Sequence, residues 1–150
     1  MELDRGTLFI GVDLAWAEGS AAKVANESGV VCIDGTGRVI HAGWTVGVTE
    51  TTKCIQTLTA EASRAVVFVD APLVVTNESG QRLCERLVGR RYGRWLISAN
   101  STNKRTKRLA GVTLLAQLED LGWTYDTGHG GGPSADRVVS ECYPWTTIVG

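Results

Sequence analysis

The sequence predicts an α/β protein built around one mixed β-sheet. Three strand-like segments come first, over residues 8–14, 29–34 and 38–45, and their linkers are too short for crossover helices. A helix-like segment and a strongly apolar strand follow, and two further helices and a last strand complete the order. Hairpin connections and helical crossovers in one chain favour a sheet that is partly antiparallel and partly parallel.

The first half of the chain predicts an antiparallel meander. Residues 8–14 form an apolar run that is typical of a buried strand, with the carboxylate of Asp13 near its end. Residues 29–34 and 38–45 flank the short Gly35-Thr36-Gly37 connection, which favours a hairpin. We therefore expect the first three strands to pair in sequence order.

The second half of the chain alternates helices and strands. A helix is expected over residues 50–63, with Thr49 as a candidate cap. The apolar strand over residues 65–70 is reached through this helix, so we expect it to lie parallel to the first strand. The remaining expected elements are helices over residues 79–88 and 107–121, a Gly-rich loop over residues 124–136 and a last strand over residues 137–142.

Composition narrows the class of protein. The chain has 150 residues, 15 Lys and Arg against 16 Asp and Glu, and 43% hydrophobic residues, which favours one globular domain and excludes a globally basic nucleic-acid-binding protein. No apolar run approaches the roughly 18 residues of a membrane helix. The start, Met1-Glu2-Leu3-Asp4, lacks the basic region of a signal peptide, so we expect a cytoplasmic protein with no membrane contact.

The four cysteines do not indicate a metal site. Cys32, Cys54, Cys84 and Cys142 are scattered and lack the close pairing that structural zinc requires. Without an export signal, we expect reduced and mostly buried thiols.

Acidic residues close three of the predicted strands: Asp13, Asp70 and Glu141. If these strands are parallel neighbours, the three carboxylates meet at one edge of the sheet, where open α/β sheets bind ligands. Converging carboxylates repel one another unless a cation neutralises them, and oxygen ligands suit Mg²⁺ or Mn²⁺. The alternative is that each is only a turn or cap residue.

Short motifs in a fixed order carry a family resemblance. They are Phe9-Ile-Gly-Val-Asp-Leu-Ala-Trp16, Val69-Asp-Ala-Pro-Leu73, Arg82-Leu-Cys-Glu85, Tyr92-Gly93, Gly111-Val112 and Glu141-Cys-Tyr-Pro144. Over residues 8 to 150 the chain resembles the predicted RNase H-like nuclease family (domain of unknown function 429). Trp16, just after the first motif carboxylate, is a candidate for the rim of the site.

The resemblance implies a fold and a set of roles. It implies an RNase H-like sheet, with Asp13, Asp70 and Glu141 as both the metal ligands and the catalytic carboxylates. Residues 1–150 are then a single RNase H-like domain. RNase H-like enzymes usually add a late carboxylate from a C-terminal helix, and the sequence stops before one, so we expect this domain to lack its C-terminal helices and the fourth ligand.

Basic residues are concentrated in the middle of the chain. Nine of the 15 fall between residues 82 and 108 and are interleaved with Tyr92 and Trp95, a composition that suits phosphate contact and base stacking. The alternative is a solvated helix face, and Arg82 and Glu85 can instead pair structurally. The candidate substrate-binding residues are Arg82, Arg86, Arg90, Arg91, Lys104 and Arg105.

The sequence therefore predicts a nuclease or phosphodiesterase that acts on nucleic acid with two Mg²⁺ or Mn²⁺ ions. The alternative is a non-catalytic nucleic-acid-binding domain, degenerate or truncated. A phosphate-handling enzyme related to actin and sugar kinases needs a second domain, for which 150 residues leave no room.

Overall fold

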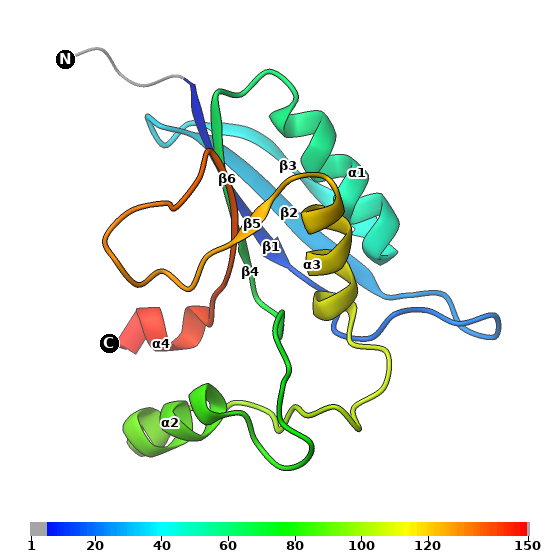
Figure 1. Cartoon of the computed structure of the whole chain (residues 1–150), viewed down its shortest axis with the longest axis vertical. Coiled ribbons are helices and arrows are strands. Elements are labelled where there is room, and N and C mark those ends of the chain that lie inside the picture. Colours follow the sequence, from blue (N-terminus) through cyan, green and yellow to red (C-terminus); the bar gives the residue numbers. More distant parts are fainter. Residues whose placement is uncertain (1–5, 150) are drawn as a thin grey trace.

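The computed structural model describes residues 6–149, and the expectation about a signal peptide concerns residues 1–4, which lie outside this range. The molecule is a mixed α/β structure around one six-stranded sheet, in which the strands follow the order β3-β2-β1-β4-β6-β5 (Figure 1). The predicted fold class, a mixed sheet in an α/β protein, is confirmed at this level. Within the described residues, no helix is long and apolar enough to span a bilayer.

The first three strands form the predicted antiparallel meander. β1 (Thr7–Asp13) pairs with β2 (Glu27–Asp34), and β2 pairs with β3 (Val39–Val46). The register shifts once, between Cys32 and Ile33, as at a β-bulge.

The other strands run parallel to β1. β4 (Arg64–Val69) follows α1 (Gly47–Thr59) and pairs with β1, as predicted for a strand reached through a helix. β6 (Arg137–Glu141) pairs with β4 in parallel, so β1, β4 and β6 are parallel neighbours. Their carboxyl ends therefore lie at the same edge of the sheet.

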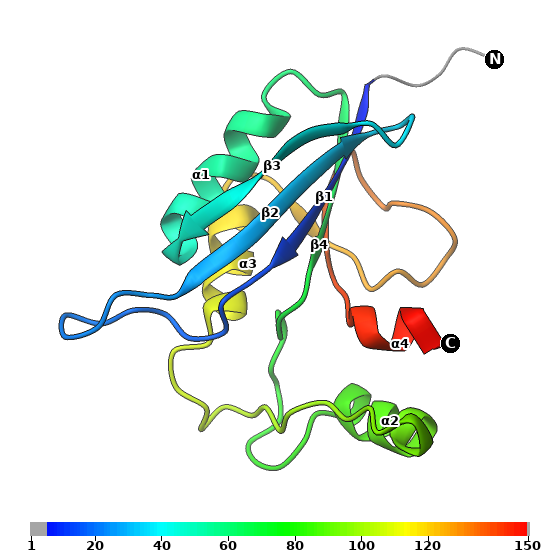
Figure 2. The same cartoon turned by 180° about the vertical axis from the view of Figure 1, so that it is seen from behind.

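Two helices cover one face of the sheet. α1 and α3 (Ala110–Asp120) lie side by side on it, and Figure 2 shows the opposite face of β1, β2 and β3 without a helix. Alternate residues of the strands point into the helical layer and meet side chains of both helices. The fully buried members of this core include Ile10, Val67, Val139, Ile55, Leu114 and Leu118.

The helix boundaries differ from those predicted. α1 begins at Gly47 rather than residue 50 and ends at Thr59, and Thr49 is not its cap. The Glu50 carboxylate instead accepts a hydrogen bond from the backbone N–H of Val46 at 3.0 Å. An acidic residue in the first turn therefore pairs with the backbone donor of the residue that precedes the helix.

The middle and end of the chain also depart from the prediction. The helix expected over residues 79–88 is α2 (Leu83–Tyr92), extended by a 3₁₀ turn over Gly93–Trp95, because its first turn is capped at Arg82. The helix expected over residues 107–121 is the shorter α3. Three further differences are the short strand β5 (Thr124–Tyr125) inside the expected loop, the end of β6 at Glu141, and α4 (Pro144–Val149) after it.

Gly111 brings the start of α3 against the segment that follows β4. A Cβ atom built on this glycine would lie 2.2 Å from the backbone oxygen of Pro72 and 3.2 Å from the Cβ of Ala71. Both obstacles directly follow Asp70. The close approach therefore needs a residue without a side chain, and it fixes the turn that carries Asp70.

This contact predicts that Gly111→Ala lowers the free energy of unfolding by about 2–3 kcal/mol. The added methyl group would overlap backbone atoms of Pro72, which cannot move aside as a flexible side chain can. The matched control is Gly89→Ala in α2, where a Cβ meets nothing within 4 Å. That substitution should raise the stability by up to about 1 kcal/mol through helix propensity. Urea denaturation of both variants measures the difference, and equal effects would contradict the packing argument.

Candidate functional site

The carboxyl ends of the parallel strands carry the three predicted acidic residues. Asp13 ends β1, Glu141 ends β6, and Asp70 directly follows β4. In the sheet register Val12 lies beside Val69, and Val69 beside Glu141, so the three positions are neighbours along one edge. The structure thus places these residues together as the sequence predicts. We call this edge the carboxylate edge.

Asp70 is held by its backbone and leaves its carboxylate free. Its N–H donates to the carbonyl of Val12 at 2.9 Å, and its own carbonyl accepts the indole N–H of Trp16 at 3.1 Å. Among residues 6–149, the carboxylates of Asp13 and Asp70 have neither a hydrogen-bond nor an ion-pair partner. Burial, and then the charges of Asp13 and Glu141, raise the pKa of Asp70.

The Glu141 carboxylate, in contrast, has hydrogen-bond partners within the protein. Both of its carboxylate oxygens accept hydrogen bonds from the guanidinium of Arg82, at 2.7 and 2.8 Å, and one also accepts the backbone N–H of Leu73 at 3.0 Å. Such a bidentate pair is strong and directional. The Glu141 carboxylate is therefore paired with a cation within the protein, unlike the carboxylates of Asp13 and Asp70.

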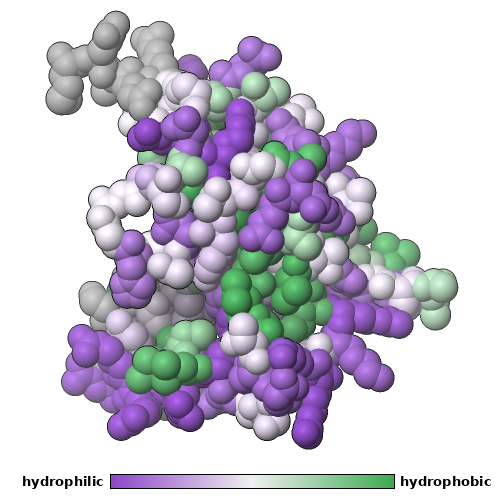
Figure 3. Space-filling view, viewed as in Figure 1, coloured by the Kyte–Doolittle hydropathy of each residue, from purple (hydrophilic) through white to green (hydrophobic). Residues whose placement is uncertain are grey.

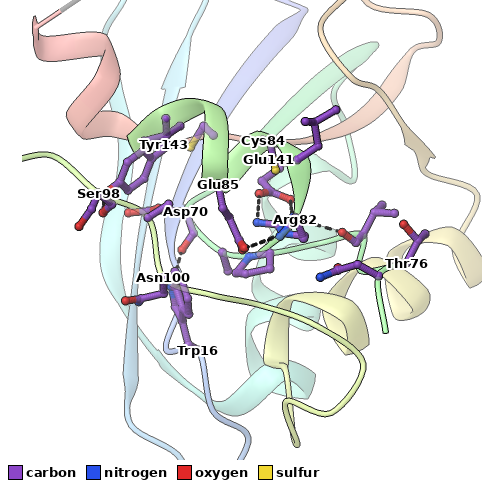
Figure 4. A pocket seen from close by; sticks show the side chains of 18 of the residues that line it. Trp16, Asp70, Thr76, Arg82, Cys84, Glu85, Ser98, Asn100, Glu141 and Tyr143 are labelled. Carbon is purple, nitrogen blue, oxygen red and sulfur yellow. Dashed lines mark hydrogen bonds and ion pairs between the residues drawn. The ribbon is translucent and has the colours of Figure 1, made fainter. Parts of the chain in front are cut away.

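Arg82 also bonds to Glu85, the one side chain of α2 that is buried. The guanidinium Nε donates to Glu85 at 2.8 Å, the backbone N–H of Arg82 donates to the other Glu85 oxygen at 2.8 Å, and the N–H of Thr102 donates to that oxygen at 2.9 Å. The structural pairing of Arg82 and Glu85, one of the two alternatives from the sequence, is therefore present. We call Glu141, Arg82 and Glu85 the ion-pair triad (Figure 4).

The electrostatics of the ion-pair triad favour the charged forms. Burial disfavours charge on Glu85, but hydrogen bonds from Thr102 and Arg82 outweigh it and lower the pKa of Glu85. Burial likewise works against the charge of Arg82, and its bonds to Glu141 and Glu85 hold its pKa above the ordinary value.

A cavity of about 610 Å³ lies between the carboxylate edge and α2. Figure 4 shows Trp16, Asp70 and Asn100 on one side and the ion-pair triad on another. The segment after β4, the inward side of α2 and residues 98–100 form most of the remaining wall, and Tyr125 and Tyr143 add aromatic rings. Trp16 is thus at the site, as predicted. The sequence did not indicate Tyr125 as a site residue, because its short strand lies in the segment that is predicted to be a Gly-rich loop.

The other basic candidates lie outside the cavity. Arg82 lines it, but the exposed side chains of Arg86, Arg90 and Arg91 do not. The surface over α2 is mainly hydrophilic, with a small hydrophobic group within it (Figure 3). Lys104 is paired with Glu78 at 2.6 Å, and Arg105 is exposed and also outside the cavity.

The cysteines are free thiols, but only Cys32 is buried, so the expectation of mostly buried thiols is wrong. Cys84 and Cys142 line the cavity. Burial and the nearby Asp70 and Glu141 charges raise the pKa of Cys142 to about 11, which keeps this thiol protonated and poorly nucleophilic at neutral pH.

Within residues 6–149, no group of three or more His, Cys, Asp and Glu side chains is arranged to hold a metal ion. Asp13 and Asp70 keep unpartnered carboxylates beside each other, whereas Arg82 occupies the third. The residues therefore provide two free carboxylate groups, and the third carboxylate becomes available only if its ion pair with Arg82 opens.

Comparison with known proteins gives one match. The chain belongs to the family described as a protein of unknown function (DUF429), whose model matches residues 11–149. No curated protein and no solved structure is similar enough to this chain to be matched.

The ion-pair triad predicts a large cost for removing its centre. Arg82→Met leaves the Glu85 carboxylate, which is 3% exposed, without its cation, and should lower the free energy of unfolding by about 3–5 kcal/mol. The control is Lys104→Met, which breaks an exposed pair and should cost less than about 1 kcal/mol. Denaturation of both variants by urea compares them. Equal small losses would show that the ion-pair triad adds little to stability.

Proposed function

We propose that this protein is a metal-dependent nuclease or phosphodiesterase that acts on nucleic acid. One observation carries the proposal: Asp13 and Asp70 hold free carboxylates at the ends of neighbouring parallel strands, and the pKa of Asp70 is raised. Uncompensated acidic groups in such a position cost stability, and a cation between them removes the repulsion. Such costly arrangements are concentrated at functional sites.

We further propose that the sheet is of the RNase H-like kind. An antiparallel meander followed by parallel strands at β1, β4 and β6, with the acidic residues at their carboxyl ends, supports this assignment. The short β5 at the far edge is an addition to the predicted order.

The donor set suits Mg²⁺ or Mn²⁺. Magnesium is commonly bound by one or two carboxylates, with water and substrate phosphate completing its shell. Asp13 and Asp70 would hold such an ion. When bound, it activates water and stabilises the leaving oxygen in phosphodiester cleavage. Two carboxylates support one ion better than the two-ion arrangement expected from the family resemblance.

Glu141 then acts mainly as a positioning residue. It binds Arg82 and the N–H of Leu73, and so holds the segment that starts at Asp70. The role of Glu141 as a direct ligand, which the resemblance implies, requires Arg82 to move away. Substrate phosphate is one group that could draw the guanidinium off, because arginine binds phosphate in the same bidentate way.

Nucleic acid contact outside the cavity falls to the exposed basic residues. Arg86, Arg90 and Arg91 stand on α2, and Arg105 lies in the segment that returns to α3. Their charges attract a phosphate backbone without reading its sequence.

The proposal predicts Mg²⁺- or Mn²⁺-dependent cleavage of labelled single- or double-stranded DNA or RNA, abolished by EDTA. Asp13→Asn and Asp70→Asn should each lower the rate by about a hundredfold or more, because each removes charge that holds the metal. The control is Asp120→Asn at the exposed end of α3, which should cleave normally. Cleavage that persists in EDTA, or in both site variants, would contradict the proposal.

A second candidate function is nucleic-acid binding without catalysis. The pairing of Glu141 with Arg82 favours it, since among the described residues only two of the three strand-end carboxylates, those of Asp13 and Asp70, stay free. It predicts salt-sensitive binding that Asp70→Asn leaves intact, together with no cleavage by the unaltered protein under any metal. Fluorescence anisotropy against salt concentration, run beside the cleavage assay, separates the two functions. Measurable Mn²⁺-dependent turnover would eliminate this second candidate.

A further inference from the structure

The cavity shares Asp70 with the carboxylate edge. Asp70 lines the cavity, and the charge of Asp13 acts on it from the neighbouring strand end. A ligand that fills the cavity therefore lies next to any cation, and its phosphate, that Asp13 and Asp70 would hold. Asp70 thus belongs both to the cavity wall and to the carboxylate edge.

The size of the cavity suits a group of nucleotide dimensions. Its volume of about 610 Å³ is within the usual range of small-molecule pockets, about 300–1,000 Å³. A base stacked and paired inside a duplex cannot enter such a recess, whereas an unpaired or flipped base can. The shape thus favours single-stranded nucleic acid.

Two of the aromatic residues that line the cavity are held by hydrogen bonds from their polar ends. The indole N–H of Trp16 is bonded to the carbonyl of Asp70, and the hydroxyl of Tyr143 donates to the carbonyl of Ser98 at 2.7 Å. Rings held in this way lose little entropy when a planar group stacks on them. Stacking on aromatic side chains is the usual means of binding unpaired bases.

The charge of the cavity selects against phosphate inside it. Its charged lining residues are Asp70, Glu85, Glu141 and Arg82, three acids against one base. A neutral ring is better matched to this net negative charge than an anion is, and the side-chain oxygen of Asn77, which also lines the cavity, is a buried acceptor without a hydrogen-bond partner among the described residues, so it suits a ring that bears N–H groups. In the described part of the chain, Asn100, on the rim, has a side chain with no hydrogen-bond partner and is available to such a ring.

We propose that the cavity binds the unpaired, amino-bearing base of a single-stranded nucleic acid, beside the place where a divalent cation on Asp13 and Asp70 would bind the phosphate. The inference rests on the proposed function and specifies its substrate class. The protein then selects strands by an exposed base and duplexes are poor substrates.

The test is binding of labelled single strands of equal length in Ca²⁺, which limits cleavage. The probes are oligodeoxycytidine, whose base carries an amino group, oligodeoxythymidine, whose base does not, and an abasic chain with the same phosphates. We expect the cytidine strand to bind about tenfold or more tightly than the abasic chain, and more tightly than the thymidine strand. Equal affinity for all three would overturn the inference.

Two variants on one helix provide the matched comparison. Val88→Trp fills the cavity and should remove the preference for bases, while Leu87→Trp, which adds the same ring at a half-exposed position outside the cavity, should keep it. Asn100→Ala, at an exposed position, should reduce the preference for cytidine over thymidine and does not depend on repacking. A preference that survives Val88→Trp and Asn100→Ala would overturn the assignment to this cavity.

The binding experiment tests the cavity separately from the cleavage experiment, which tests the proposed function. Base-dependent binding without metal-dependent cleavage would support the cavity and contradict the nuclease. Metal-dependent cleavage with equal binding of abasic and natural strands would support the nuclease and contradict the cavity.

Discussion

The architecture of the site depends on the bond between Arg82 and Glu141. Glu141 ends a strand of the sheet, whereas Arg82 begins α2, which stands away from the sheet in both views (Figures 1 and 2). Glu85 is the one buried residue of α2, so apolar burial does little to hold that helix in place. Arg82 joins Glu85 to Glu141 and thereby fixes the far wall of the cavity. Because ion pairs rather than packed apolar side chains hold α2 beside the sheet, the space between them stays open and can admit a polar ligand.

The same bond divides the acidic residues into two kinds. Three carboxylates at one edge repel one another, and the protein partly offsets the charge of Glu141 by pairing it with Arg82. The two that remain, on Asp13 and Asp70, are the groups that a divalent cation would neutralise. The fold thus accounts for both the position of the proposed metal and the cavity beside it. In the proposed function, the exposed arginines of α2 would provide a phosphate-binding surface outside the cavity.

The sheet was predictable from the sequence, and much of the site was not. The short Gly35-Thr36-Gly37 connection indicated a hairpin, and the apolar run before Asp70 indicated a strand parallel to the first, which brought Asp13, Asp70 and Glu141 to one edge. The start of α2 was missed because Arg82 caps it through a capping box with Glu85, and arginine is not a usual cap residue. The pairing of Glu141 with Arg82 was missed for another reason. It joins residues 59 positions apart, and no local pattern encodes such a contact.

The most direct test of the central claim is the anomalous scattering of Mn²⁺ in crystals of the protein soaked in that ion. The account predicts a manganese peak between the carboxylates of Asp13 and Asp70, absent in Asp70→Asn, with Arg82 still bonded to Glu141. A manganese ion on Glu141 with Arg82 displaced, or no ion at the carboxylate edge at concentrations that support cleavage, would contradict the account.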